Sequence, residues 1–123
     1  MATVLIVEDE PVVLTLAESV LQHAGYDTIS AATLAEAEAI LRSGASIDVV
    51  ATDIGLGEEL DGGLKIGQVA TEQYPGIPIL YVSGRPLTDG MKALFVEPNA
   101  FLPKPYTDEQ LISGVSSLLR EGD

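Results

Sequence analysis

The chain has 123 residues, 46% of them hydrophobic, and this length suits one domain with a substantial core. It contains no cysteine, which excludes disulfide bridges and thiolate metal sites, and no apolar run approaches the roughly 20 residues that span a bilayer. The 19 acidic residues outnumber the 6 basic ones, and the net charge of −13 opposes binding to nucleic acid or to an anionic membrane. A cytoplasmic protein is therefore the first expectation.

Five apolar runs rich in strand-forming residues recur along the chain. Near-continuous runs such as IDVVAT and IPILYVS are typical of parallel strands that are covered on both faces. The second run is weak and the fifth is short. The predicted strands span residues 3–7, 28–30, 47–52, 77–83 and 100–102.

Segments with helical spacing lie between these runs. Pro11 suits the first position of a helix, and Gly25 suits the residue after its end. Thr33-Leu-Ala-Glu36 and Thr107-Asp-Glu-Gln110 have the pattern of capping boxes, which open helices. The predicted helices span residues 11–24, 33–43, 62–73, 88–96 and 107–120.

Strand and helix thus alternate five times. This pattern predicts an open, doubly wound α/β sheet with right-handed crossovers. With the strand order 2-1-3-4-5, strands one, three, four and five are consecutive neighbours. The five units fill residues 1–123, so we expect one domain with no room for a separate output domain.

Four of the five predicted strands end in polar side chains. Glu8 and Asp9 follow the first strand, Asp53 the third, Ser83 the fourth and Lys104 the fifth. Ligands of such sheets bind at the carboxyl ends of the strands. Each residue alone has a structural explanation, such as a helix-dipole charge, a cap or a turn. Their joint occurrence at one edge favours a functional site.

The three acids at this edge would repel one another unless a cation lies among them. Mg²⁺ takes oxygen ligands, keeps several waters and needs one or two carboxylates together with phosphate oxygens. Glu8, Asp9 and Asp53 supply carboxylates, and the backbone carbonyl of Gly55 adds another oxygen. We therefore expect a magnesium site, and a raised pKa for at least one of the acids without metal.

The remaining groups suit a phosphoryl group. Lys104 carries a compact positive charge, and Ser83 has a hydroxyl that donates a hydrogen bond. A carboxylate such as Asp53 acts as a nucleophile in some enzymes. The set has the parts for moving a phosphoryl group onto an aspartate.

These stretches together resemble the receiver domain of two-component response regulators. The resemblance covers essentially the whole chain and depends on VLIVEDEP, TDIG followed by DGG, VSG and FLPKPY, in this order. It implies a flavodoxin-like fold with a five-stranded parallel sheet. It also implies a phosphoryl-accepting signalling domain that is served by a histidine kinase or a histidine phosphotransfer protein.

The resemblance also implies a role for each site residue. Asp53 matches the phosphoacceptor, and Glu8 and Asp9 match the metal-site acids. Ser83 matches the switch hydroxyl and Lys104 the lysine that contacts the phosphoryl group. Three further positions match the aromatic switch and two modulators of phosphoryl lifetime: Phe101, Gly55 and Arg85.

Three features depart from the family pattern. Gly57 stands where the family often has proline, and the Asp61-Gly62 pair comes one residue later than usual. Both changes put the path of this loop in doubt. Phe101 stands where many relatives have tyrosine, so its side chain rotates and packs but forms no hydrogen bond.

The implied mechanism is a switch rather than catalytic turnover, so the domain promotes only its own phosphorylation and dephosphorylation. Phosphorylation of Asp53 changes the face formed by the fourth helix, the fifth strand and the fifth helix. An unknown output protein reads this face, and a weak homodimer through it is a further expectation.

Three alternatives stay open. In these alternatives the chain is a receiver module cut from a hybrid histidine kinase, a magnesium-dependent phosphatase-like enzyme, or a flavodoxin. Haloacid-dehalogenase-like enzymes carry Asp-x-Asp after the first strand, which Glu8-Asp9-Glu10 lacks, and Toprim-like enzymes carry it after a later strand, where Asp53-Ile54-Gly55 lacks the second acid. The same first-strand acids would repel the phosphate of a flavin.

Overall fold

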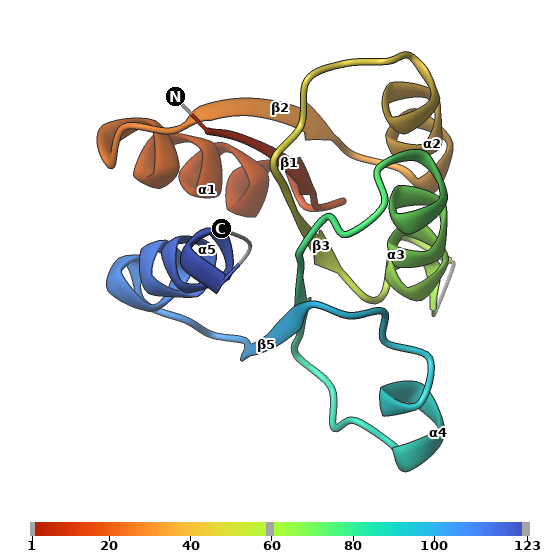
Figure 1. The fold of residues 1–123 in the computed structure, drawn as a ribbon. Helices are drawn as coiled ribbons and strands as arrows, with labels where there is room; N and C mark the ends of the chain where they lie inside the picture. Colours follow the sequence, from red (N-terminus) through yellow and green to blue (C-terminus); the bar gives the residue numbers. More distant parts are fainter. Residues whose placement is uncertain (1, 59–60, 122–123) are drawn as a thin grey trace.

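The computed structural model describes residues 2–58 and 61–121, which form one sheet with helices on both faces (Figure 1). The strands are β1 (Thr3–Val7), β2 (Asp27–Ala31), β3 (Val49–Asp53), β4 (Ile79–Ser83) and β5 (Asn99–Pro103). The helices are α1 (Pro11–His23), α2 (Leu34–Arg42), α3 (Gly62–Gln73), α4 (Asp89–Lys92) and α5 (Asp108–Glu121).

All five strands are parallel, and their order is β2-β1-β3-β4-β5. The predicted strand order and the flavodoxin-like (βα)5 fold are therefore confirmed. The chain reverses its direction of winding between β1 and β3, so the carboxyl ends of these strands open at the switch point where such sheets bind ligands. In Figure 1, α1 and α5 lie on one face of the sheet, and α2 and α3 lie on the other.

Alternation along the buried strands divides the core into two layers. On β1, Leu5 and Val7 belong to the layer beneath α2 and α3, whereas Val4 and Ile6 belong to the layer beneath α1 and α5. The four side chains are almost completely buried. Because successive side chains of a strand point to opposite faces, a continuous apolar run serves both layers, as the sequence predicted.

Local signals set most helix starts as predicted. Pro11 is the first residue of α1. At α5 both capping-box bonds are present: Thr107 Oγ1 accepts from the Gln110 N–H at 3.1 Å, and Gln110 Oε1 accepts from the Thr107 N–H at 2.8 Å. Thr33 caps α2 by accepting from the Glu36 N–H at 3.1 Å. These bonds satisfy amides that a helix N-terminus otherwise leaves unpaired.

The fourth helix is much shorter than the predicted 88–96. Thr88 caps it as expected, with its hydroxyl accepting from the Met91 N–H, but α4 ends at Lys92. The following residues contact the core instead, since the Val96 N–H donates to the Tyr81 hydroxyl at 3.1 Å. With Gly90 inside the segment and Pro98 after it, a weak helical tendency gives way to these tertiary contacts.

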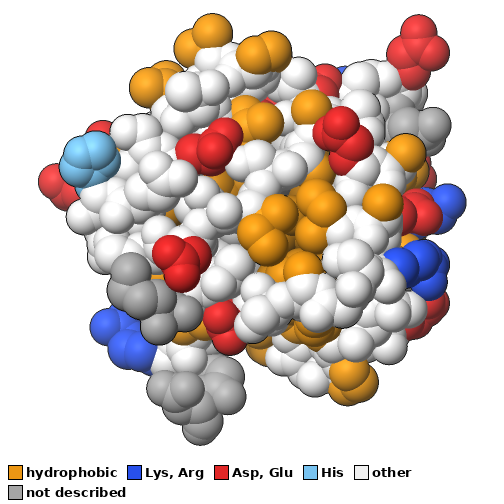
Figure 2. Space-filling model, turned by 90° about the horizontal axis from the view of Figure 1, so that it is seen from above, with side chains coloured by type: hydrophobic (Ala, Val, Ile, Leu, Met, Phe, Trp, Pro, Cys, Tyr) orange, Lys and Arg blue, Asp and Glu red, His pale blue; other side chains and the backbone are white. Residues whose placement is uncertain are grey.

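Acidic side chains are scattered over the face seen in Figure 2, with lysine and arginine at its margins. This distribution fits acidity that serves solubility outside the site. None of the described helices is long and apolar enough to cross a membrane.

Candidate functional site

Backbone hydrogen bonds continue the sheet one step past its carboxyl edge. Residues that follow β1, β3 and β5 each donate their N–H to the carbonyl of a neighbouring strand. The bonds are Glu8 to Ala31 (3.1 Å), Ile54 to Val82 (2.9 Å) and Lys104 to Ser83 (2.9 Å). The sheet itself therefore fixes where the polar side chains start, and it brings together residues that lie far apart in the sequence.

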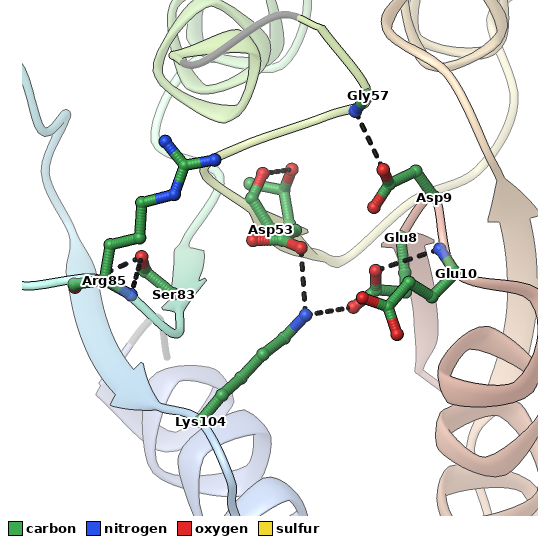
Figure 3. A network of polar contacts seen from close by, with 9 residues as sticks. Glu8, Asp9, Glu10, Asp53, Gly57, Ser83, Arg85 and Lys104 are labelled. Carbon is green, nitrogen blue, oxygen red and sulfur yellow. Dashed lines mark hydrogen bonds and ion pairs between the residues drawn. The ribbon is translucent and has the colours of Figure 1, made fainter.

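Lys104 links the acids of two strands (Figure 3). Its Nζ lies 2.6 Å from Glu8 Oε1 and 2.9 Å from Asp53 Oδ2. The three side chains are largely shielded, with exposed fractions of 21% for Lys104, 6% for Glu8 and 13% for Asp53. The ammonium thus offsets part of the repulsion between the acids, a task that the sequence analysis gave to a metal ion alone.

Burial and charge act in opposite directions on this group. Burial raises the pKa of the Glu8 carboxyl above its ordinary value, and the nearby Asp53 charge adds to the rise, against the hydrogen bonds from Lys104 and the Glu10 N–H. Burial alone would lower the pKa of the Lys104 ammonium, but its bonds to Glu8 and Asp53 raise it. The expected raised carboxyl pKa is confirmed at Glu8, with burial rather than repulsion as the main cause.

Asp9 is held from the opposite side of the site. The Gly57 N–H donates to Asp9 Oδ2 at 2.8 Å, and Gly57 has a φ of +59°, which favours glycine. The departure from proline at this position therefore has a local role, because proline has no N–H and cannot adopt a positive φ. The loop path is thereby defined up to residue 58, while residues 59 and 60 lie outside the described part of the chain.

The donor set suits Mg²⁺. Glu8, Asp9 and Asp53 each offer a carboxylate oxygen, and these oxygens lie within 4.8 Å of one another. Among the described residues, Asp9 and Asp53 each engage one oxygen in a hydrogen bond or ion pair, whereas Glu8 engages both. The second oxygens of Asp9 and Asp53 therefore match the one or two carboxylates that magnesium needs.

Ser83 is buried beside this group, but its hydroxyl is bonded within its own turn. Ser83 Oγ accepts from the Arg85 N–H at 3.1 Å and donates to the Arg85 carbonyl at 3.4 Å (Figure 3). The hydroxyl has no hydrogen bond to Asp53 among the described contacts. A rotation about its χ1 angle would free it for another acceptor.

A cavity of about 720 Å³ opens over these residues. Its walls include most of the predicted site residues together with several loop residues: Asp9, Asp53, Gly55, Gly57, Asp61, Ser83, Arg85 and Lys104. Glu8 is not one of its wall residues and lies deeper, beside a small cavity of about 20 Å³. The structure thus places Gly55 and Arg85 in the wall of the same cavity, and Glu8 contacts that cavity's wall through its bond to Lys104.

Phe101 lies apart from the carboxylates. It is partly buried and lines a neighbouring cavity of about 690 Å³, which shares Ser83, Arg85 and Lys104 with the site. The Phe101 ring centroid is 6.5 Å from that of Phe95. The predicted switch residue is therefore adjacent to the site through shared walls.

Gly63 is a positioning residue that the sequence analysis did not single out. A Cβ on Gly63 would lie 2.2 Å from the Asp53 carbonyl oxygen and 2.6 Å from the Ile54 Cα. Only glycine lets α3 begin this close to the end of β3. Two consecutive glycines at the start of a predicted helix, where they disfavour helix formation, were the available signal.

Comparisons with known proteins identify relatives that match most of this chain. The model of the response regulator receiver domain matches residues 4–116. Among curated proteins, the sensor kinase CckA of Brucella abortus is 33% identical over 99% of this chain, and the transcriptional regulatory protein BasR of Escherichia coli is 33% identical over 95% of it. The chain spans 13% and 52% of the length of these two relatives.

Solved structures show the same likeness. A response regulator receiver protein from Sinorhizobium medicae has a TM-score of 0.90 and 37% identity, with 99% of this chain and 97% of that chain covered. The chemotaxis response regulator CheY4 of Vibrio cholerae has a TM-score of 0.83 and 27% identity, with 96% and 98% covered. The fold, the acidic edge and the family match over almost the whole length agree: this chain belongs to the receiver domain family of two-component response regulators.

Proposed function

We propose that Asp53 accepts a phosphoryl group from a phosphohistidine donor in a magnesium-dependent reaction. The observation that carries this proposal is the pairing of Asp53 with Lys104 at 2.9 Å, beside Glu8 and Asp9 and at the mouth of an open cavity. The Asp53 carboxylate is shielded from bulk water yet reachable from one side. This is the arrangement that in-line attack on a phosphoryl group requires.

The transfer exchanges one bond for another. An Asp53 oxygen forms a bond to phosphorus as the bond between phosphorus and the histidine nitrogen breaks, and the imidazole keeps that electron pair. Lys104 balances charge on the transferred oxygens. Asp9, Asp53 and the Gly55 carbonyl would hold Mg²⁺ directly, and Glu8, whose two oxygens are already bonded, would complete the acidic metal site with its charge. The bound metal supplies neutralisation of the phosphoryl oxygens. Arg85 stands at the cavity wall, where its charge would tune phosphoryl lifetime.

The switch follows from the freedom of Ser83. After transfer, its hydroxyl leaves the Arg85 backbone and donates to a phosphoryl oxygen, and Phe101 turns toward the space beside Ser83. The face formed by α4, β5 and α5 then changes, and an output protein or a second copy of the chain reads it. The domain promotes only its own phosphorylation and dephosphorylation and turns over no external substrate.

The donor would dock beside α1. Val12 and Leu16 are exposed by 71% and 61%, although both are large and apolar. Leu16 also borders a groove of about 440 Å³ between α1 and α5, whose wall includes Lys104 from the site. We assign this surface to the helical domain of a histidine kinase or a histidine phosphotransfer protein in the cytoplasm. Residues 1–123 would act as one receiver unit, alone or as a module of a hybrid kinase.

Intact mass after incubation with acetyl phosphate and Mg²⁺ tests the proposal. Wild type should gain one phosphoryl group, and Asp53→Asn should gain none. The matched control is Asp61→Asn, which removes another carboxylate from the same cavity and should still be modified. Phosphorylation of Asp53→Asn would refute the assignment, and sustained hydrolysis of a phosphate ester by wild type would favour the phosphatase-like alternative.

A further inference from the structure

Tyr81 is a polar residue at the centre of the core that the phosphoryl chemistry does not use. It lies on β4 two residues before Ser83, and it pairs with Phe101 across the β4–β5 ladder. Its exposed fraction is 0%. A buried hydroxyl at such a position needs a hydrogen-bond partner, and a phenylalanine would avoid that need.

The partner belongs to the segment after α4, residues 93–97. The Val96 N–H donates to the Tyr81 hydroxyl at 3.1 Å. The Phe95 ring stacks on the Tyr81 ring with centroids 4.0 Å apart and an interplanar angle of 15°. Burial raises the pKa of the Tyr81 hydroxyl, so it remains protonated near neutral pH. Tyr81 therefore holds this segment by one stack and one hydrogen bond.

Helix α3 has a glycine, Gly67, where the Tyr81 hydroxyl packs against it. A Cβ on Gly67 would lie 2.2 Å from the Tyr81 hydroxyl oxygen and 3.2 Å from the ring carbon that bears it. Glycine inside a helix costs stability relative to alanine, so its use here has a packing reason. The hydroxyl occupies a slot between Gly67 and Val96, and the slot would be too narrow with any other residue at position 67.

The segment also touches the switch residue. The Phe95 ring stacks on Tyr81, and its centroid lies 6.5 Å from that of Phe101, the residue paired with Tyr81 on the neighbouring strand. Phe95, Phe101 and Ser83 line the same cavity. An inward turn of Phe101 therefore changes the packing of Phe95. The hydrogen bond from the Val96 N–H to Tyr81 opposes a movement of the neighbouring backbone.

We propose that the Tyr81 hydroxyl is a latch that holds residues 93–97 against the core and thereby restrains the face formed by α4, β5 and α5. The role of the latch in signalling rests on the proposed phosphorylation of Asp53. Tyr81 is a positioning residue, because it acts on this face through Phe95 and Val96 and touches no reacting atom.

The first test is Tyr81→Phe, which keeps the ring and removes the hydroxyl. In the unphosphorylated variant, the Val96 amide should exchange its hydrogen about fivefold faster, the factor expected for one lost hydrogen bond. Amide NMR peaks of residues 92–97 should move part of the way toward their positions in the phosphorylated wild type. The control is Tyr74→Phe, which removes a hydroxyl bonded to the Ala45 carbonyl at 2.7 Å and should leave these peaks in place.

The second test uses the slot. Gly67→Ala in wild type should displace the hydroxyl, lower the melting temperature and speed exchange at Val96. In the Tyr81→Phe background the same substitution should cost less, because the atom that lay 2.2 Å from the new Cβ is gone. This non-additivity reports a direct contact and would not arise from two separate effects on stability.

The outcomes separate the latch from the phosphorylation proposal. Equal exchange at Val96 in Tyr81→Phe and Tyr74→Phe, or additive effects of the Gly67 and Tyr81 substitutions, would overturn the latch. Peaks that move away from the phosphorylated positions would also overturn it. If wild type gains no phosphoryl group, the proposed function fails, while the exchange and double-variant measurements still decide whether the latch exists.

Discussion

The carboxylate half and the hydroxyl half of the site are built differently. In the carboxylate half, Glu8, Asp9 and Asp53 are held by contacts from Lys104 and Gly57, which come from other elements of the chain. In the hydroxyl half, the only partner of the Ser83 hydroxyl among the described residues is the backbone of Arg85, two residues away. One half is fixed by the tertiary fold and the other by a local turn.

This difference separates the two tasks of a receiver domain. Groups that position a phosphoryl group work best when their geometry is set before the reaction. A switch group must have a second arrangement of similar free energy. The following predictions, from the largest expected effect to the smallest, test whether the two halves differ in this way.

Lys104→Met should have the largest effect, a loss of about 3 kcal/mol in the free energy of unfolding at neutral pH in EDTA, because it leaves buried carboxylates unpaired. The loss should shrink as pH falls from 7 to about 5. Burial raises the Glu8 pKa in the folded state and Lys104 lowers it, so removing Lys104 raises this pKa further in the folded variant than in wild type. Lowering the pH therefore protonates Glu8 in the folded variant before it does in the unfolded chain, and it stabilises the variant more than wild type. Denaturant unfolding at several pH values measures this.

The control is Lys65→Met. Lys65 pairs with Glu38 at 3.6 Å on the surface, where an ion pair contributes less than about 1 kcal/mol. If both variants lose the same stability, or if the Lys104→Met loss does not depend on pH, the carboxylate half is not held by Lys104.

Gly63→Ala should cost about 2–3 kcal/mol, because its Cβ meets the backbone of Asp53 and Ile54 and α3 must move. Gly90→Ala is the control, since the new Cβ would lie an ordinary 3.9 Å from Thr88 Oγ1. Thermal unfolding compares the two variants. A Gly63→Ala variant as stable as Gly90→Ala would show that α3 need not start so close to the end of β3.

Gly57→Ala should cost about 1 kcal/mol through its positive φ, and it should also weaken Mg²⁺ binding severalfold by disturbing the N–H that orients Asp9. Gly25→Ala introduces a similar strain at φ +100°, far from the site, and should leave Mg²⁺ affinity unchanged. Calorimetric titration with Mg²⁺ measures both. Equal affinities in the two variants would mean that Asp9 needs no support from the loop.

Ser83→Ala should have the smallest effect on stability, below about 1 kcal/mol, because the two hydrogen bonds that are lost lie within one turn and the longer is 3.4 Å. It should still accept a phosphoryl group, but the phosphorylation-induced NMR shifts of Phe101 and residues 92–96 should shrink. Ser116→Ala removes a surface hydroxyl of α5 that bonds within its own helix, and it should keep the full shifts. Wild-type shifts in Ser83→Ala would remove Ser83 from the switch.

Much of the fold was predictable because local signals and global packing agree. The first strand matches its predicted range, Thr3–Val7, and the Thr107 capping box opens α5 as expected. The sequence also predicted which residues lie at the edge. All strands of a parallel sheet end at the same edge, so the polar side chains that follow the apolar runs meet there. The weak strand β2 is longer than predicted because pairing with β1, not its own composition, extends it.

The contacts within the edge were not predictable in the same way. Lys104 was assigned to a phosphoryl group, but without one it bonds to Glu8, which lies 96 residues earlier in the chain. The local sequence around Lys104 or Glu8 gives no sign that the two side chains form an ion pair. The short α4 is a similar case, because the hydrogen bond from Val96 to Tyr81 competes with helix formation and joins two elements. Tertiary contacts decided both outcomes.

The charges that meet at Lys104, Glu8 and Asp53 have a consequence for how fast different phosphodonors react. Without metal, three carboxylates and one ammonium give the site a formal charge of −2, which a bound Mg²⁺ would cancel, but the chain as a whole has a net charge of −13. A small anionic phosphodonor must diffuse against this field, and added salt shortens its reach from about 30 Å at 0.01 M to about 8 Å at 0.15 M. A donor domain with a basic surface is instead attracted. We therefore expect the acidity of the chain to slow encounters with small free phosphates more than encounters with a protein donor that has a basic surface.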